Sequence, residues 1–160
     1  MKTSYLFPYR FKLISGVLFA VSLALFVTYY CADKYLDFEY KTQVFAIVGD
    51  TGLLGDSDWF GWIENSIIDE ILFTIVIASG LIFAFSKEKT EDEMVASIRL
   101  NSLVKATIAN YVILLFLYLT VYGFSFLTVL NGAMFSQLLI FIVLFRINMY
   151  RFNKFASHEE

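Results

Sequence analysis

The sequence predicts an all-α membrane protein with four transmembrane helices and an exported segment between the first two. Two observations predict this class. The 160-residue chain is 59% hydrophobic and only 17% charged, with a mean hydropathy of +0.68, and it contains four apolar runs of about 20 residues. A soluble domain with a polar surface does not have this composition. We therefore expect residues 1–160 to form a single transmembrane domain.

The four runs are bounded by charged residues or turn signals. A bilayer core about 30 Å thick needs roughly 20 apolar residues per helix. The predicted spans are residues 13–30, 67–86, 102–122 and 133–153. The first apolar run is longer than the core of a typical signal peptide and is not followed by a small-residue cleavage site, so we expect it to be retained as a helix.

Turn signals alone divide the third span from the fourth, because no charged residue lies between them. Asn131-Gly132 is the strongest of these signals. We therefore expect the turn region over residues 123–132. The alternative places the turn wholly at Gly123 and leaves Asn131 inside the membrane.

The distribution of basic residues predicts the orientation. Residues 1–12, 86–105 and 146–160 together hold ten Lys or Arg, whereas residues 31–70 hold two Lys and nine acids. Because Lys and Arg near span ends favour the cytoplasmic side, both termini and the loop 87–101 are expected in the cytoplasm. The chain is thus predicted to be a multi-pass membrane protein with both termini on the cytoplasmic side.

The exported segment, residues 31–66, is too short for an independent core. Residues 40–48 are rich in β-branched and aromatic residues and favour a strand, with residues 35–39 as the candidate partner in a short β-hairpin. Trp59 and Trp62 follow in an aromatic run typical of a lipid interface.

The loop 87–101 contains three consecutive acids on an otherwise basic side of the membrane. The pattern Thr90-x-x-Glu93 resembles a capping box and predicts that the third helix begins near Glu91. Glu91, Asp92 and Glu93 exceed what one cap requires, so they are candidate residues for binding a basic partner. The alternative is a solvated helix start.

Two further groups of residues suggest membrane contacts. Arg146, Arg151 and Lys154 alternate with aromatic residues at the end of the fourth span, a pattern that suits anionic lipid headgroups. Asn110 and Gln137 are polar residues inside spans, and they either pair with each other in an interhelical hydrogen bond or line a pore. So short a basic stretch gives no reason to expect a nucleic-acid partner.

Residues able to do covalent or metal chemistry are scarce. The chain has one His and one Cys, so neither a zinc or iron site nor a nucleophile with a histidine base is expected. We predict no catalytic residue, no metal and no cofactor.

Several strings of residues carry a resemblance. They are Phe85-Ser86-Lys87-Glu88-Lys89, Glu91-Asp92-Glu93, Ile98-Arg99-Leu100, an N-terminal Leu6-Phe7-Pro8 and a C-terminal Tyr150-Arg151. With these strings the chain resembles an uncharacterised family of small bacterial four-span integral membrane proteins. The resemblance implies the topology and a bacterial origin, and it implies no catalytic residue.

The functional hypothesis is a non-enzymatic inner-membrane sensor or accessory subunit that acts through protein or lipid interaction. Its expected partners are membrane lipids and either further copies of itself or a larger membrane complex. The alternative is an oligomeric pore or channel-like component, such as a defence or stress effector. A lipid-modifying enzyme is the least supported hypothesis.

Overall fold

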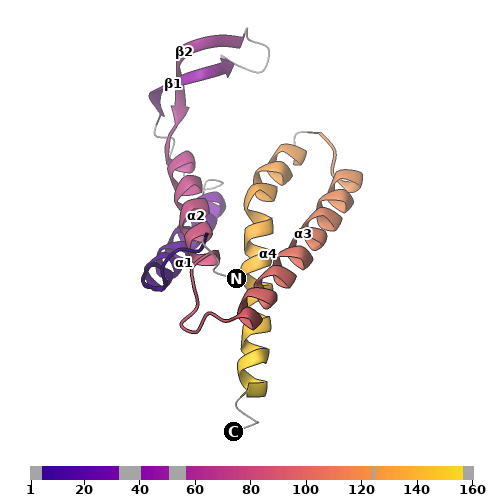
Figure 1. The fold of residues 1–160 in the computed structure, drawn as a ribbon. Coiled ribbons are helices and arrows are strands. Elements are labelled where there is room, and N and C mark those ends of the chain that lie inside the picture. The colour runs from indigo at the N-terminus through magenta and orange to yellow at the C-terminus, as the bar shows by residue number, and fades with distance from the viewer. Residues whose placement is uncertain (1–4, 33–40, 51–56, 124, 157–160) are drawn as a thin grey trace. The chain divides into compact units, whose positions relative to one another are not determined.

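The computed structural model describes residues 5–32, 41–50, 57–123 and 125–156. These residues form four helices and one antiparallel pair of strands (Figure 1). In chain order the elements are α1 (Tyr9–Ala32), β1 (Lys41–Asp50), β2 (Ser57–Ser66), α2 (Ile68–Ala84), α3 (Glu93–Thr120) and α4 (Ser125–Ala156). The prediction of a mostly helical chain with one hairpin is confirmed.

Three helices, α1, α3 and α4, are long and apolar enough to cross a membrane. Large apolar side chains on their outward faces are exposed, as Leu13, Ile108 and Leu127 show. Such faces are costly in water and favourable against lipid. α2 has 17 residues, which corresponds to about 25 Å and is slightly shorter than a bilayer core. The helices therefore support a multi-pass membrane protein.

The chain divides into two compact units, residues 17–78 and residues 1–16 with 79–160. Within the first of these units, Phe26 of α1 packs on Phe73 of α2 with ring centroids 5.9 Å apart. β2 leads into α2 through the single residue Ile67. The hairpin and the first part of α2 are therefore directly joined in the chain.

The hairpin uses a different second strand from the predicted one. β1 pairs with β2 in a register that runs from Lys41 opposite Ser66 to Asp50 opposite Ser57. The predicted partner, residues 35–39, lies outside the described residues. Trp59 and Trp62 are strand residues of β2, because aromatic side chains favour strands as well as lipid interfaces.

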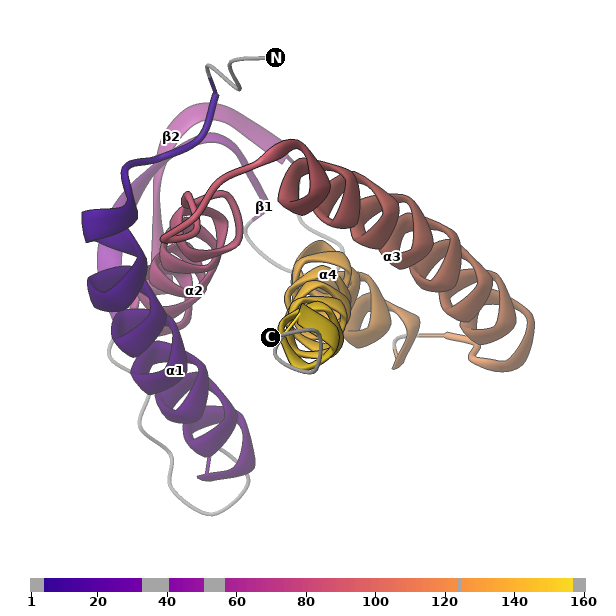
Figure 2. The same ribbon diagram turned by 60° about the horizontal axis from the view of Figure 1, so that its bottom comes forward.

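In the other unit α3 and α4 are antiparallel neighbours joined by a short connection (Figure 1), and Figure 2 shows α4 almost end-on beside α3. Their core contains Val95, Ala106, Phe141 and Phe145, together with Ala84 of α2. The amino-terminal part of α1 belongs to the same unit. A Cβ on Gly16 would lie 2.8 Å from Phe83 Cε2, so the aromatic ring lies against the α1 backbone.

The turn between α3 and α4 corrects the predicted turn region 123–132. α3 ends at Thr120 and α4 begins at Ser125, so the turn is at Gly123, whose φ is +73°. Glycine adopts this conformation without the steric cost of a side chain. Asn131 and Gly132 lie inside α4, as the alternative required.

The two glycines give a prediction with opposite signs. Gly123→Ala should lower the free energy of unfolding by about 1 kcal/mol, because a Cβ is strained at positive φ. Gly132→Ala should raise it by up to about 1 kcal/mol, because alanine favours a helix and a Cβ there meets no atom within 4 Å. Unfolding by denaturant in detergent micelles measures both changes. A destabilised Gly132→Ala would contradict this turn position.

Candidate functional site

Polar side chains join α3 to α4. Three hydrogen bonds cross between the helices: Ser136 Oγ to Asn110 Oδ1 (2.6 Å), Gln137 Nε2 to Thr107 Oγ1 (3.1 Å) and Asn148 Nδ2 to Ser102 Oγ (2.9 Å). Asn110 and Gln137 thus do not bond to each other, and each bonds to a different residue of the facing helix. Small residues along α3 let the helices approach closely, and Ser102 and Ala106 are fully buried there.

At one end of this unit, the N-terminal segment is hydrogen-bonded to the connection between α2 and α3. Phe7 N donates to Phe85 O (3.0 Å), and Lys87 N donates to Phe7 O (2.9 Å). These two bonds form a parallel bridge between Phe7 and Ser86. The chain before α1 is therefore held beside the end of α2.

Four charged side chains around this bridge form what we call the inner cluster: Lys12, Glu88, Glu91 and Arg99. Lys12 of α1 pairs with Glu88. Arg99 of α3 binds Glu91 through two hydrogen bonds, Nη1 to Oε1 (2.5 Å) and Nη2 to Oε2 (3.1 Å). Each carboxylate thus has its own cation, and the two pairs tie the α2–α3 connection to α1 and to α3.

Arg99 is the most enclosed charge of the inner cluster, with its side chain 8% exposed. Its Nη2 also lies 3.4 Å from Ser86 O, and its guanidinium carbon lies 5.1 Å from the centre of the Phe145 ring of α4. A buried cation needs such partners, because an unpaired one is strongly destabilising. Arg99 thereby connects α3, α4 and the α2–α3 connection at one point.

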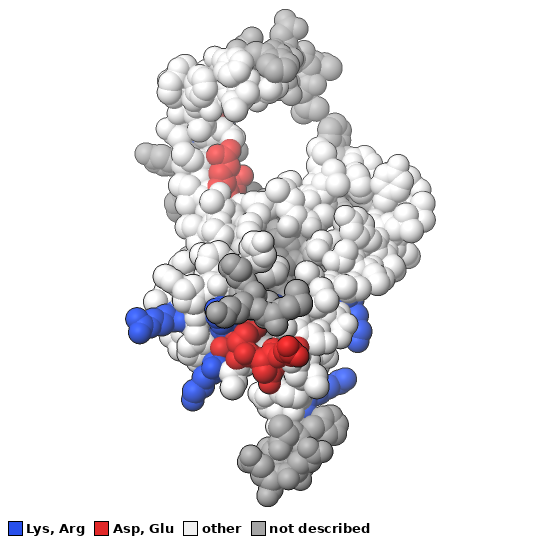
Figure 3. All heavy atoms as spheres, viewed as in Figure 1, with Lys and Arg blue, Asp and Glu red and all other residues white. Residues whose placement is uncertain are grey.

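Figure 3 shows acidic side chains gathered between lysine and arginine side chains near the start of α3. In the same view the surface around the α3–α4 connection carries no charged side chain. On the helix pair, the charge seen in this view is therefore concentrated at one end.

The pairing with Arg99 shifts the ionisation of Glu91. Burial by itself would raise the pKa of the Glu91 carboxyl, but hydrogen bonds from Arg99 and from Glu88 N, together with the Arg99 and Lys87 charges, outweigh it. The pKa of Glu91 is therefore lowered from its ordinary value. The ion pair with Arg99 persists into mildly acidic solution.

The three candidate partner-binding acids have different surroundings. Glu91 is engaged by Arg99. Asp92 is the N-cap of α3 and accepts a hydrogen bond from Val95 N (2.7 Å), so the predicted cap at Thr90 is wrong. An aspartate caps a helix as well as a threonine does, and here it stands one residue before Glu93. Asp92 and Glu93 are both exposed.

The predicted lipid-interface residues also differ among themselves. The Arg146 guanidinium carbon lies 4.7 Å from the centre of the Phe83 ring, so this arginine joins α4 to α2. Arg151 and Lys154 lie exposed in the last turns of α4. Trp62 is 70% exposed on β2, where Trp59 pairs with Val48.

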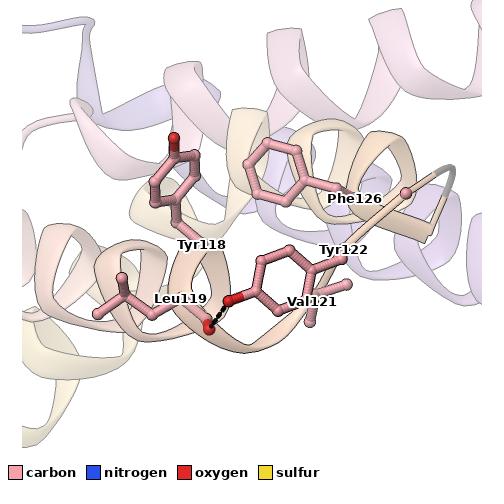
Figure 4. Close-up of a pocket in the computed structure, with 6 residues that line it drawn as sticks. Tyr118, Leu119, Val121, Tyr122 and Phe126 are labelled. Atoms are coloured by element: carbon pink, nitrogen blue, oxygen red, sulfur yellow. Dashed lines mark hydrogen bonds between the residues drawn. The ribbon is translucent and has the colours of Figure 1, made fainter.

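Two hollows of 260 Å³ each lie beside α3 and α4. The first, at the α3–α4 connection, is lined by Tyr118, Leu119, Val121, Tyr122, Gly123 and Phe126, with Tyr122 Oη donating to Leu119 O (Figure 4). The second is lined by Leu81, Phe85, Leu103, Met134, Gln137, Leu138 and Phe141. Both linings are mainly apolar, which suits aromatic packing or an acyl chain.

Nothing in the described part of the chain assembles a metal site, since no three His, Cys, Asp or Glu side chains come together there. Comparison with protein-family models, with curated proteins and with solved structures gave no match. The resemblance to small four-span bacterial proteins therefore stays a prediction.

Sequence reasoning missed most of the inner cluster. In the sequence, Arg99 and Glu88 belong only to strings that carry the resemblance, and Lys12 is only one of the basic residues that predict the orientation. A usable signal did exist for Arg99, because Val95, Arg99, Ser102 and Ala106 lie on one buried helical stripe. A charge on a buried stripe requires a partner.

The Arg99–Glu91 pair predicts a pH dependence of stability. A lowered folded-state pKa means that Glu91 stabilises the fold above its unfolded pKa, and that this contribution disappears as the pH falls through the folded pKa. Glu91→Gln should therefore lower the free energy of unfolding by about 2 kcal/mol at pH 7. The variant should lose less stability than the parent chain on acidification below about pH 4.5.

Unfolding curves in detergent between pH 3 and pH 7 measure this difference. Arg99→Met should lower the free energy of unfolding. Arg99→Lys keeps the positive charge but cannot make both hydrogen bonds to the Glu91 carboxylate, so its stability should lie between that of Arg99→Met and that of the parent chain. Equal acid sensitivity in Glu91→Gln and the parent chain would contradict the assignment.

Proposed function

We propose that the chain is a non-enzymatic sensor or accessory subunit of the bacterial inner membrane. It crosses the membrane four times, with α2 and its flanking residues as the shortest span, and both termini lie in the cytoplasm. The basic residues near the span ends support this orientation. The three long apolar helices support the membrane location.

The observation that carries the proposal is the inner cluster. Contacts in one small region join the segment before α1, the end of α2, the start of α3 and, through Phe145, α4. A displacement of α1 or α2 therefore has to move or break the Lys12–Glu88 pair or the Phe7–Ser86 bridge. This arrangement suits a protein that transmits an event on the exported hairpin to its cytoplasmic end.

The proposed output of the sensor is the binding of a cytoplasmic partner, and we assign this binding to the exposed acids Asp92 and Glu93. Glu91 supports them indirectly by fixing the α2–α3 connection through Arg99. A basic partner complements this surface, and Arg151 and Lys154 add contacts to anionic lipid headgroups. The expected assembly is a homo-oligomer or a larger membrane complex.

A pore is the alternative function. The polar side chains of Asn110 and Gln137 bond to neighbouring residues across α3 and α4, which favours packing over a water-filled path. The test is ion flux through liposomes containing the purified chain. Flux that disappears in Asn110→Leu or Gln137→Leu would favour the pore over the sensor.

The proposed topology predicts a labelling pattern. Cys31 is the single cysteine of the chain, and an impermeant thiol reagent should label it from outside. In a Cys31→Ser background, Lys89→Cys and Ser157→Cys should react only after the membrane is opened, because both positions are cytoplasmic. Labelling at position 89 in sealed cells would overturn the orientation.

The proposed output predicts a salt-sensitive interaction. Asp92→Asn removes a charge but keeps a good N-cap, so it should reduce partner recovery severalfold at low salt with little change in folding. The difference should shrink at high salt, because exposed charges are then screened. Crosslinked, affinity-purified membranes analysed by mass spectrometry measure the recovery.

Glu64→Gln is the matched control, since it removes the same charge from the exported hairpin and should leave recovery unchanged. Glu93→Gln should act like Asp92→Asn. Unchanged recovery in both cytoplasmic variants would leave the acids as a solvated helix start and remove the proposed output.

A further inference from the structure

The outer edge of β1 has no strand beside it in the described part of the chain. The sheet consists of β1 and β2 only, so β1 presents a row of backbone N–H and C=O groups on the side away from β2. Residues 42–49 carry no charge and no proline. Long, uncharged, regular edges of this kind readily pair with another strand.

The sequence of β1 is nearly symmetrical about Ala46. Phe45 and Ile47 flank it, Val44 and Val48 come next, and the polar Thr42 and Asp50 lie at the two ends. An antiparallel strand pair related by a twofold axis places each residue opposite one that is equally far from the centre. A palindromic pattern of apolar and polar residues is therefore suited to pairing with itself.

We propose that two copies of the chain associate through antiparallel pairing of β1 with β1, centred on Ala46. The product is a four-stranded sheet in the order β2, β1, β1, β2. Phe45 then lies opposite Ile47 of the second copy, and Val44 lies opposite Val48. Aromatic and β-branched pairs of this kind stabilise antiparallel strands.

Neighbouring registers match less well. In a symmetric antiparallel pair one residue lies at the twofold axis, opposite its own copy in the second chain. The alternative registers therefore differ in which residue of β1 is this central one. A centre at Phe45 places polar Gln43 opposite Ile47, and a centre at Ile47 places Val44 opposite charged Asp50. Ala46 is the centre that keeps apolar residues opposite apolar residues.

The exposed edge also selects the class of occupant. Acyl chains have no donor or acceptor for backbone groups, so lipid leaves the edge unsatisfied, whereas a strand satisfies it. The outer edge of β2 suits pairing less well, because Phe60 has φ +58° and interrupts the extended backbone. A two-stranded hairpin is also only marginally stable alone, and a four-stranded sheet relieves this.

The twofold axis of such a pair runs perpendicular to the sheet. Both chains keep the same membrane orientation only when this axis follows the bilayer normal, so the middle of the hairpin has to lie parallel to the bilayer. The inference rests on the proposed function only in placing both hairpins on the same side of one membrane.

Disulfide crosslinking in native membranes tests the register. Cys31→Ser removes the natural cysteine, and Ala46→Cys then places two thiols on directly opposite residues. Opposite Cα atoms in antiparallel strands are about 4.5–5.5 Å apart, within the range of a disulfide. Mild oxidation should therefore convert most of Ala46→Cys into a dimer of twice the 18.4 kDa chain mass.

Two further positions keep the test decisive if Ala46→Cys folds poorly. Val44→Cys alone should not crosslink, because its own copy lies about 13 Å away along the strand, and Val48→Cys alone should behave likewise. Coexpressed, the two variants should form a mixed dimer. The matched control on β2, Ile63→Cys, should stay monomeric.

The proposal is overturned if Ala46→Cys and the mixed pair both stay monomeric, or if Val44→Cys alone or Ile63→Cys crosslinks as efficiently. Neither result depends on the cytoplasmic acids. Loss of partner recovery in Asp92→Asn together with monomeric Ala46→Cys would leave the proposed function in place and remove only this interface.

Discussion

The need to pair a buried guanidinium governs the cytoplasmic end proposed for this protein. Breaking a buried ion pair by removing one partner costs several kcal/mol, whereas one backbone hydrogen bond contributes about 1 kcal/mol. Arg99 therefore has more influence on the path of the α2–α3 connection than the Phe7–Ser86 bridge beside it. Once Glu91 binds Arg99, Asp92 is the next residue and caps α3. The position of the exposed acids Asp92 and Glu93 thus follows from the ion pair between Glu91 and Arg99.

Hydrophobic length predicted the helices well. A segment that crosses lipid needs apolar side chains over the thickness of the bilayer, and a helix satisfies its backbone hydrogen bonds internally. Hydrophobic length predicted the turn between α3 and α4 poorly. Asn131-Gly132 is a strong turn signal in water, yet a continuous helix satisfies its backbone groups, and Gly123 already supplies the positive φ. The second strand was missed because Trp59 and Trp62 suit both a strand and a lipid interface, and composition does not separate the two.

The candidate site was predicted less completely than the helices. Counting charges identifies the side of the membrane, but it does not identify which charge meets which. Glu91, one of the candidate partner-binding acids, is hydrogen-bonded to Arg99, a contact that counting charges does not predict. Asn110 and Gln137 were considered as partners of each other, whereas each bonds to a residue that sequence spacing does not indicate. Such pairs depend on the rotation of both helices about their axes, and small residues along a seam constrain that rotation only loosely.

The close approach of Gly16 to Phe83 links three helices sterically. Any side chain at position 16 pushes on the Phe83 ring, whose near atom lies 2.8 Å from where a Cβ would stand. The same ring also contacts the Arg146 guanidinium. In related chains, therefore, a larger residue at position 16 should be accompanied by a smaller one at position 83. Where the aromatic ring is lost, the selection that keeps an arginine at position 146 weakens, so the three positions should covary as a set.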